Sequence, residues 1–221
     1  MKKEIPVQKG KKYEIEINSL GSSGEGVGRI KDFTVFVPYT LPGEKAEVLI
    51  EEVKKSYAKG RVLQILRKSG DRVEPQCAIY DKCGGCQLQH LSYEAQLKVK
   101  RQRVIDAVTR IGKQTGVPVH PTIGAKEPWN YRNKMQFPVG RSKGKTVIGC
   151  FAQGSHEIID TENCYIQKAV NNDIANAMRE IVDKLGITVY NEERHTSDLR
   201  HVIGRVGKKG ECMVVRGTAV Q

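Results

Sequence analysis

Three closely spaced cysteines, Cys77, Cys83 and Cys86, constrain this chain more than any other feature, because they form the pattern C-x5-C-G-G-C. Thiolates placed this close together can hold a soft metal ion or an iron–sulfur cluster. Gly84 and Gly85 allow the backbone to fold tightly around such a group, since glycine reaches positive φ without steric cost. The pattern predicts a cysteine-lined metal centre whose fourth ligand comes from elsewhere in the chain.

The other cysteines have different surroundings. Cys164 stands in a polar stretch and is the candidate for the distant fourth ligand. Cys150 and Cys212 each lie in an apolar run with strand character, so we predict that both are buried strand thiols and that Cys212 is inert. Four thiolates suit zinc and an iron–sulfur cluster equally. However, zinc ribbons usually contain two C-x2-C pairs, and only Cys83 and Cys86 form one here.

The charge of the chain favours a polyanionic partner. The 221 residues carry a net charge of +12, which points first to nucleic acid. Basic side chains without acidic neighbours gather at 54–68, 98–103 and 129–146. The sequence has no apolar run of 18 residues and no hydrophobic stretch at its N-terminus. We therefore expect a cytoplasmic protein with reduced thiols, no membrane contact and no obligate protein partner.

Residues 1–68 are predicted to form an all-β domain. Residues 13–17 alternate with period two, and 33–37, 47–53 and 61–66 also have strand character. Short strands joined by such glycine- and proline-bearing turns favour a small OB-like barrel. The glycines at 24, 26 and 28 are interpreted as a tight inter-strand loop. A phosphate-binding loop needs a helix behind it, and no helix signal follows them.

Residues 69–221 are predicted to form an α+β domain. Ser92 is the expected N-cap of a helix whose apolar positions, from Leu97 to Ile111, face a core. A second helix is expected from Ile166 to Leu185. Strands are expected at 135–137, 146–151, 157–160, 199–206 and 211–216, with a basic hairpin turn at 140–146.

Together these motifs resemble the N-terminal part of the RNA uracil-C5 methyltransferases, in particular their 23S rRNA branch. Residues 1–68 are similar to a TRAM domain, the OB-like RNA-binding barrel of those enzymes. Residues 77–90 resemble the family's iron–sulfur signature, 129–136 its Tyr-Arg-Asn-Lys motif, and 199–202 another recurring stretch. The resemblance covers nearly the whole chain.

The resemblance implies a [4Fe–4S] cluster held by Cys77, Cys83, Cys86 and Cys164. It also implies methyl transfer from S-adenosylmethionine to C5 of a uridine in 23S rRNA. In that chemistry a thiolate adds to C6, C5 attacks the methyl group, and a base removes the C5 proton. The nucleophile, the base and the S-adenosylmethionine site belong to a further Rossmann-like domain of the family.

No strand, glycine-rich loop and helix of the Rossmann kind is recognisable in this sequence. We therefore expect an N-terminal OB-like (TRAM) barrel at 1–68, followed by an α+β iron–sulfur and RNA-binding domain at 69–221. The Rossmann-like methyltransferase domain is expected to be absent from the chain. S-adenosylmethionine would then serve only the full-length enzyme, and the 221 residues alone would be inactive.

The candidate RNA contacts come from the basic stretches. The strand edge at 54–68 would hold phosphates, and Tyr57 among these charges could stack a base. Residues 132, 134 and 136 alternate along one predicted strand and therefore share a face. His201 can equally be interpreted as a structural histidine or as an RNA contact. The full set is Lys54, Lys55, Tyr57, Lys59, Arg61, Arg132, Lys134, Gln136, Arg200 and His201.

Two other functions remain open from the sequence. One is a standalone RNA-binding module that is stabilised by a metal and has no catalytic activity. The other is a redox protein that uses the cluster for electron transfer. The basic surface and the barrel disfavour the redox function.

Overall fold

The computed structural model describes residues 5–192, 194–195 and 198–218. The chain divides into two compact units, of which unit 1 comprises residues 1–74 and 87–123 and unit 2 comprises 75–86 and 124–221. The chain therefore passes between the units at three places. The functional division at residue 68 stays a prediction, because the units are defined by contacts alone.

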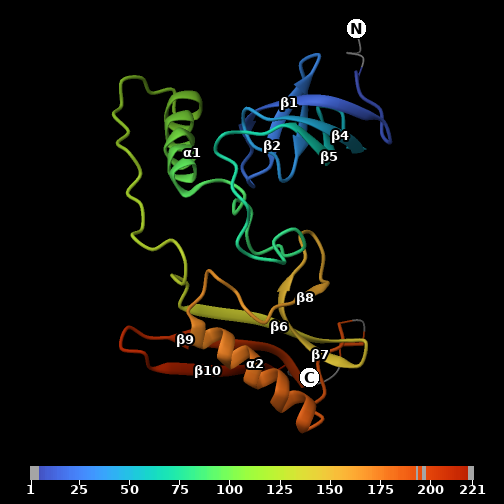
Figure 1. Cartoon of the computed structure of the whole chain (residues 1–221), viewed down its shortest axis with the longest axis vertical. Helices are drawn as coiled ribbons and strands as arrows, with labels where there is room; N and C mark the ends of the chain where they lie inside the picture. The colour runs from blue at the N-terminus through green and yellow to red at the C-terminus, as the bar shows by residue number, and fades with distance from the viewer. Residues whose placement is uncertain (1–4, 193, 196–197, 219–221) are drawn as a thin grey trace. The chain divides into compact units, whose positions relative to one another are not determined.

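Unit 1 contains a closed five-stranded barrel with the strand order β1-β2-β3-β5-β4 (Figure 1). All neighbouring pairs are antiparallel except β3 and β5, which run parallel. Alternate residues such as Ile15, Ile17, Val35 and Val37 fill the interior. The strands are β1 (Lys12–Leu20), β2 (Gly26–Ile30), β3 (Phe33–Val37), β4 (Lys45–Val53) and β5 (Tyr57–Arg67).

The interpretation of the glycine stretch as an inter-strand loop holds for Gly24, which lies between β1 and β2, but is wrong for Gly26 and Gly28, which lie in β2. The glycines are needed because β1 passes too close for side chains on β2. A Cβ atom on Gly28 would lie 2.3 Å from Ile15 Cγ2 and 2.5 Å from the carbonyl oxygen of Glu16. Glycine in a strand often marks such a close backbone approach.

The helix predicted after Ser92 is present as α1 (Tyr93–Asp106), followed by the short π-helical segment η1 (Ala107–Ile111). The Ser92 hydroxyl accepts a hydrogen bond from the backbone N–H of Ala95, which confirms the N-cap. The expected core-facing stripe is wrong, however. Ala95 is the buried residue of α1, whereas Val104 is 50% exposed and Ile111 is 83% exposed.

A second, smaller core in unit 1 joins α1 to the barrel. Buried Ala95 contacts buried Leu41, from the turn before β4, and buried Leu91. The side chain of Gln96 donates hydrogen bonds to the carbonyl oxygens of Leu88 and Leu91 at 3.1 and 2.9 Å. These contacts explain why residues 87–123 belong to the same unit as the barrel.

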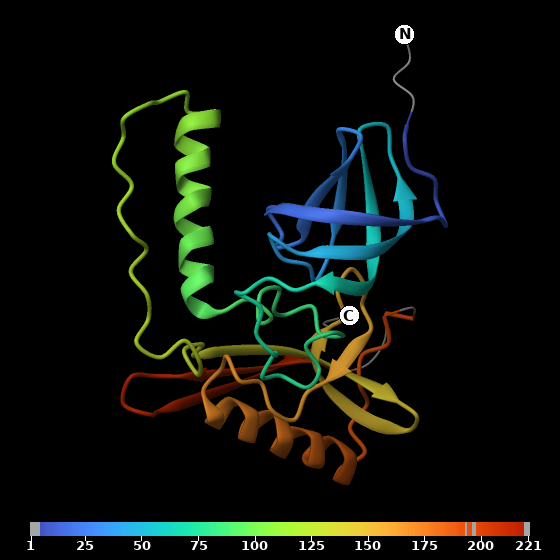
Figure 2. The same cartoon turned by 45° about the horizontal axis from the view of Figure 1, so that its top comes forward.

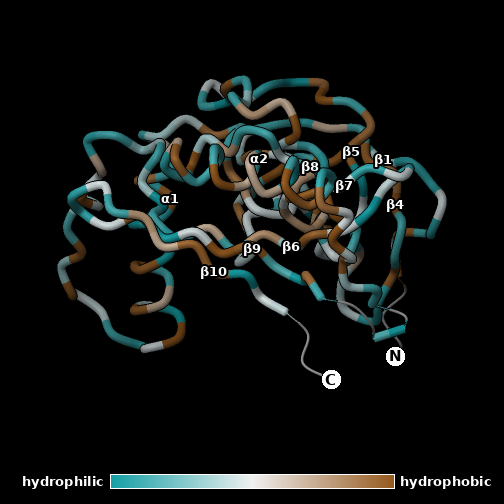
Figure 3. The backbone as a smooth tube through the Cα atoms, turned by 90° about the horizontal axis from the view of Figure 1, so that it is seen from below, coloured by the Kyte–Doolittle hydropathy of each residue, from teal (hydrophilic) through white to brown (hydrophobic). Residues whose placement is uncertain are grey.

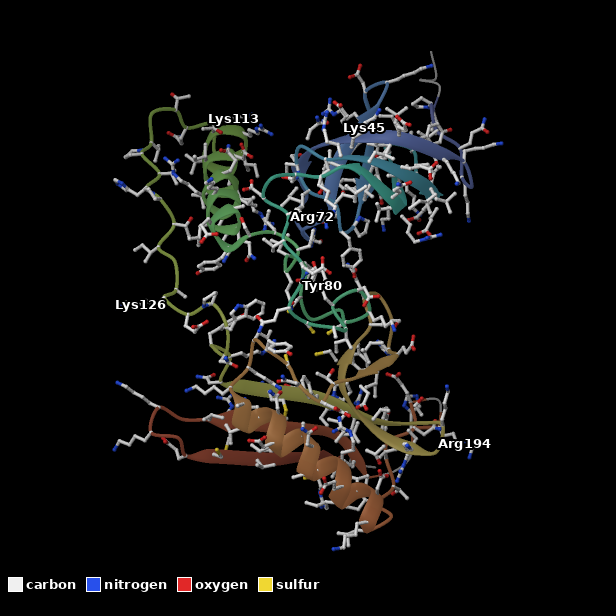
Figure 4. The ribbon with its side chains drawn as sticks, viewed as in Figure 1. Lys45, Arg72, Tyr80, Lys113, Lys126 and Arg194 are labelled. Atoms are coloured by element: carbon white, nitrogen blue, oxygen red, sulfur yellow. The ribbon has the colours of Figure 1, made fainter. Side chains whose placement is uncertain are left out.

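A buried ion pair links the barrel to the segment that follows β5. Glu44, fully buried, accepts hydrogen bonds from Arg72 Nε at 2.6 Å and Arg72 Nη2 at 2.8 Å. The backbone N–H groups of Leu41 and Ser69 also donate to this carboxylate, at 2.9 and 3.2 Å. Burial by itself raises the pKa of Glu44, but these donors hold it below its ordinary value. Figure 4 labels Arg72.

His90 lies in the same buried region of unit 1. Its ring is 2% exposed and its centroid is 6.2 Å from that of Tyr39. Burial, together with the positive charge of Arg72, lowers the pKa of His90 to about 4. The histidine is therefore neutral at physiological pH.

Unit 2 is a five-stranded antiparallel sheet with the strand order β10-β9-β6-β7-β8. One helix, α2, lies along one face of this sheet (Figures 1 and 2). A two-residue turn, Lys143 and Gly144, joins β6 to β7 with both φ angles positive, as tight hairpins require. The elements are β6 (Lys134–Ser142), β7 (Lys145–Phe151), β8 (Ile158–Asp160), α2 (Ala169–Lys184), β9 (Leu199–Val206) and β10 (Cys212–Thr218).

The core of unit 2 forms between the sheet and α2. Met135, Phe137 and Val202 of the sheet pack with Ala175 and Val182 of the helix. Hydrophobic residues recur along β6 and β9 in Figure 3.

The predicted second helix is present as α2, and apolar side chains near its C-terminal end are exposed. Ile181 is 42% exposed and Leu185 is 68% exposed. No helix in the part of the chain that the structure describes has the length and apolar character needed to cross a membrane.

Candidate metal centre and basic surfaces

Unit 2 brings cysteines from three separate segments into one region. The loop 75–86 carries Cys77, Cys83 and Cys86, strand β7 carries Cys150, and the turn after β8 carries Cys164. The thiols of Cys83 and Cys150 form a hydrogen bond. Cys164 interacts electrostatically with Cys86 and Cys83. Figure 4 shows the sulfur atoms near the loop that carries Tyr80.

Backbone pairing fixes the cysteine loop against the end of β7. Cys83 forms an antiparallel bridge with Ala152, and the N–H of Gly84 donates to the carbonyl oxygen of Phe151 at 2.9 Å. A Cβ on Gly84 would lie 2.8 Å from that same oxygen. The first glycine of the C-G-G-C motif therefore permits this close approach of two backbones.

A buried asparagine holds the turn that carries Cys164. The backbone N–H of Cys164 donates to Asn172 Oδ1 at 3.1 Å, and Gln167 Nε2 donates to the same oxygen at 2.8 Å. Asn172 in turn donates to Asn163 Oδ1 at 2.8 Å. Asn172 was not predicted from the sequence. Its signal was a pair of adjacent asparagines near the start of an otherwise amphipathic helix.

The cysteine thiols differ in acidity. The hydrogen bond from Cys150, together with one from the N–H of Gly85, lowers the pKa of Cys83 to about 6. The hydrogen bond to Cys83, together with burial, raises the pKa of Cys150. Burial raises the pKa of Cys164, although the N–H groups of Ile166 and Gln167 oppose this effect. A Cys83 thiolate beside a protonated Cys150 thiol is a good donor for a soft metal.

The chemistry of these donors fits a thiolate-bound group. Within residues 5–192, 194–195 and 198–218, no three side chains of His, Cys, Asp or Glu are grouped closely enough to hold a single metal ion. A [4Fe–4S] cluster has one cysteine on each iron, so its ligands need not converge on one point. Cys77, Cys83, Cys86 and Cys164 remain the predicted ligands.

Cys150 and Cys212 both lie on strands as predicted, but the prediction that both are buried is wrong. Cys212 begins β10 and is exposed. Cys150 is half-buried on β7 and contacts a predicted metal ligand. Apolar neighbours in the sequence did not reveal these positions, because β10 is an edge strand and β7 ends beside the cysteine loop.

The basic stretch 54–68 contains no acidic residue, but its side chains pair with glutamates of β4. Lys54 and Lys59 pair with Glu52 of β4 at 2.5 and 3.5 Å. Arg61 pairs with Glu51 at 2.8 Å. These exposed pairs reduce the positive potential of the barrel surface below what residues 54–68 alone predict. Tyr57 is half-buried and packs edge-to-face on Phe36, with ring centroids 5.5 Å apart.

Lys134 and Gln136 lie on the face of the sheet opposite the core residues Met135 and Phe137. Arg132 precedes β6 and forms a bridge with Gln167, so it is not part of that strand. The cross-strand partner of Lys134 was not predicted from the sequence.

That partner is Arg205 on β9, which lies opposite Lys134 and is itself opposite Met213 on β10. Ile203 and Val215 extend the row beside Gln136. The alternation of Arg205 with Ile203 along its predicted strand was the available signal. We name the residues Lys134, Gln136, Ile203, Arg205, Met213 and Val215 the open sheet face.

The predicted contacts Arg200 and His201 are successive residues on β9 and therefore point to opposite sides of the sheet. The Arg200 guanidinium lies over the ring of Tyr190, 4.7 Å from its centroid. Burial, together with the charge of Arg200, lowers the pKa of His201. The two residues can therefore contact one RNA strand only if it wraps around the sheet.

Comparison with known proteins assigns the barrel and relates the whole chain to RNA methyltransferases. Residues 6–63 match the TRAM domain. The chain is 46% identical to an uncharacterized RNA methyltransferase of Halalkalibacterium halodurans over 97% of its own length and 47% of that protein. It is 45% identical to one of Clostridium tetani, with the same two shares. The chain thus spans about half the length of the curated relatives it matches.

A solved structure shares the fold. The tRNA (uracil-54, C5)-methyltransferase of Pyrococcus abyssi, in complex with S-adenosyl-L-homocysteine, superposes with a TM-score of 0.64 and 27% sequence identity. The superposition covers 92% of this chain and 46% of that chain. The chain therefore carries a TRAM domain and is homologous to RNA methyltransferases over nearly its whole length.

This likeness corrects one expectation from the sequence. We expected the methyltransferase fold to be absent from the chain. A solved methyltransferase matches 92% of the chain, so these residues are built as part of a methyltransferase fold. The expectation failed because it equated that fold with a Rossmann-like unit alone. The expected inactivity of the 221 residues finds no support in these likenesses.

Proposed function

We propose that this chain provides the RNA-binding barrel and the metal centre of an S-adenosylmethionine-dependent RNA (uracil-C5)-methyltransferase that acts on 23S rRNA. The likeness to a uracil-C5 methyltransferase over 92% of the chain carries this proposal. The homology to proteins named RNA methyltransferases supports the reaction class. The choice of 23S rRNA rests on the resemblance of residues 77–90 and 129–136 to that branch of the family.

RNA is the proposed partner of both units. The barrel matches a TRAM domain, and the chain carries a net charge of +12. The open sheet face places Lys134 beside Arg205, with apolar side chains at 203, 213 and 215 on the same side. Basic groups hold phosphates, and the apolar side chains beside them offer bases an uncharged surface. The target uridine must leave its stack, which costs a few kcal/mol.

The cysteine centre is proposed to hold a [4Fe–4S] cluster through Cys77, Cys83, Cys86 and Cys164. When bound, the cluster would cross-link the loop 75–86 to the turn that precedes α2. Asn172 accepts a hydrogen bond from the backbone N–H of Cys164 and donates one to Asn163 Oδ1, and these bonds keep Cys164 in place for this role. The group would stabilise unit 2 and thereby fix the open sheet face, and no redox step is needed.

A methyl-transfer assay tests the reaction and the substrate together. The protein that carries this chain is incubated with methyl-labelled S-adenosylmethionine and with either 23S rRNA or tRNA that lacks 5-methyluridine. We expect 5-methyluridine in the digested 23S rRNA. Product in tRNA alone would keep the reaction class and reject the substrate. RNA binding without product would favour the standalone RNA-binding module. The same assay on the 221 residues alone tests their expected inactivity.

Charge removal on the open sheet face tests the RNA surface. The double replacement Lys134→Ala and Arg205→Ala is expected to weaken RNA binding. It is also expected to make the negative slope of log affinity against log salt shallower by about 1 for each lost phosphate contact. Fluorescence anisotropy over a salt series measures both quantities. The matched control is Lys184→Ala, which removes an exposed charge from α2 on the other face of the sheet. Equal losses from both proteins would argue against a specific surface.

A further inference from the structure

Cys150 occupies a position that packing alone does not explain. It is half-buried, contributes to the edge of the unit 2 core, and lies beside the cysteine loop. Cys83 pairs with Ala152, and the N–H of Gly84 donates to Phe151. The loop therefore forms a short antiparallel ladder with the end of β7. In such a ladder Cys83 and Cys150 are diagonal neighbours, whose side chains point to the same side.

Gly85 leaves the space between the two sulfur atoms open. A Cβ at this position would lie 3.4 Å from Cys83 Sγ and 3.5 Å from Cys150 Sγ. Both sulfurs therefore border the same small space, and a Cβ at 85 would make only ordinary van der Waals contact with them.

The hydrogen-bond pattern gives the contact a direction. Cys83 Sγ already accepts the N–H of Gly85 at 3.4 Å. Cys150 Sγ borders the same space, and its thiol carries an S–H donor. Two donors aimed at one sulfur hold it in a fixed place as an acceptor. Hydrogen bonds to ligand sulfurs are a main way in which proteins orient and tune thiolate-bound metal groups.

We propose that Cys150 is a positioning residue of the cysteine centre: its S–H group donates to Cys83 Sγ and orients that sulfur toward the bound metal group. Cys150 is not itself a ligand in this arrangement. The inference rests on the metal centre of the proposed function and adds to it a residue outside the four predicted ligands.

Oxygen-free reconstitution of the chain with iron and sulfide tests this role, because the iron–thiolate absorbance reports cluster assembly directly. Cys150→Ala removes the donor and is expected to raise the iron and sulfide concentration needed for half-maximal assembly by about 10-fold or more. Cys150→Ser keeps a hydroxyl donor and is expected to recover most of that loss. The matched control Cys212→Ala alters an exposed cysteine on β10 and is expected to assemble the cluster as the wild type does.

The outcomes separate the two proposals. Equal cluster assembly by wild type and Cys150→Ala would overturn the role of Cys150 and leave the metal centre intact. Equal losses in Cys150→Ala and Cys150→Ser would also overturn it, because the donor would then not be what matters. No cluster assembly by the wild type would reject the metal centre and this inference with it. RNA affinity, measured on the same variants, shows whether the proposed RNA surface is still formed.

Discussion

Arg72→Ala is expected to destabilise unit 1 by about 3–5 kcal/mol, the usual cost of removing one partner of a buried ion pair. Glu44 is fully buried, and Arg72 supplies two of its hydrogen bonds. Without the guanidinium, a carboxylate would remain in the barrel with only two backbone donors. Hydrogen exchange of the barrel amides under increasing urea measures the loss within this unit.

The control for this prediction is Arg67→Ala. Arg67 also pairs with a glutamate, Glu16, but both side chains are more than half exposed. Exposed pairs contribute about 0–1 kcal/mol, so little change is expected. Similar losses from Arg67→Ala and Arg72→Ala would contradict the role assigned to the buried pair.

The same pair predicts a pH dependence with a definite sign. The folded-state pKa of Glu44 lies below the unfolded value of 4.5. Its stabilising contribution is therefore fully present above pH 4.5 and is lost as the pH falls through the lower folded-state value. In Arg72→Ala, burial without the cation favours the protonated carboxyl group. The stability gap between wild type and variant is expected to narrow on acidification below pH 4.5, and a constant gap would argue against this cause.

Cys164→Ser is expected to remove the metal group and to lower the melting temperature of unit 2. Loss of a hydrogen bond to a metal ligand typically lowers metal affinity by about 10–100-fold, and loss of a ligand itself should lower it further. Protein purified without oxygen is analysed for iron, zinc and acid-labile sulfide. About four irons and four sulfides per wild-type chain would support the [4Fe–4S] assignment, and one zinc without sulfide would favour a structural zinc site.

Cys212→Ser serves as the control for the metal measurement, because Cys212 is exposed on β10. It should leave metal content and melting unchanged. A Cys164→Ser protein with unchanged metal content and unchanged melting would contradict the assignment of Cys164 as a ligand.

Periodic patterns predicted most of the regular structure. The alternation at 13–17 and the runs at 33–37 and 199–206 correspond to β1, β3 and β9. Strand β2 was not predicted, because its glycines have low strand propensity. They permit a close approach to β1 that is visible only in three dimensions. The exposure of apolar positions on α1 was not predicted, because a helical period identifies an apolar stripe but does not show whether another element covers it.

The site was predictable where the signal was local. The C-G-G-C motif identified the thiol loop, but its contact with Cys150 depends on backbone pairing with the end of β7. The ion pairs of Lys59 and Arg61 follow from the register of β4 and β5, in which Glu52 lies opposite Lys59. The Arg72–Glu44 pair joins residues in unremarkable sequence contexts, so only the fold reveals it.

The three passages of the chain between its units affect how the molecule can be divided. Residues 75–86 belong to unit 2, although both flanking segments belong to unit 1. A protease that cuts once, at the end of β5, would leave the barrel attached to the rest of unit 1, because Leu41 contacts Leu91 and Ala95 of the segment that contains α1. Gene fusions that exchange the barrel as one continuous piece would separate it from its own helix. The two units are therefore expected to be inherited together.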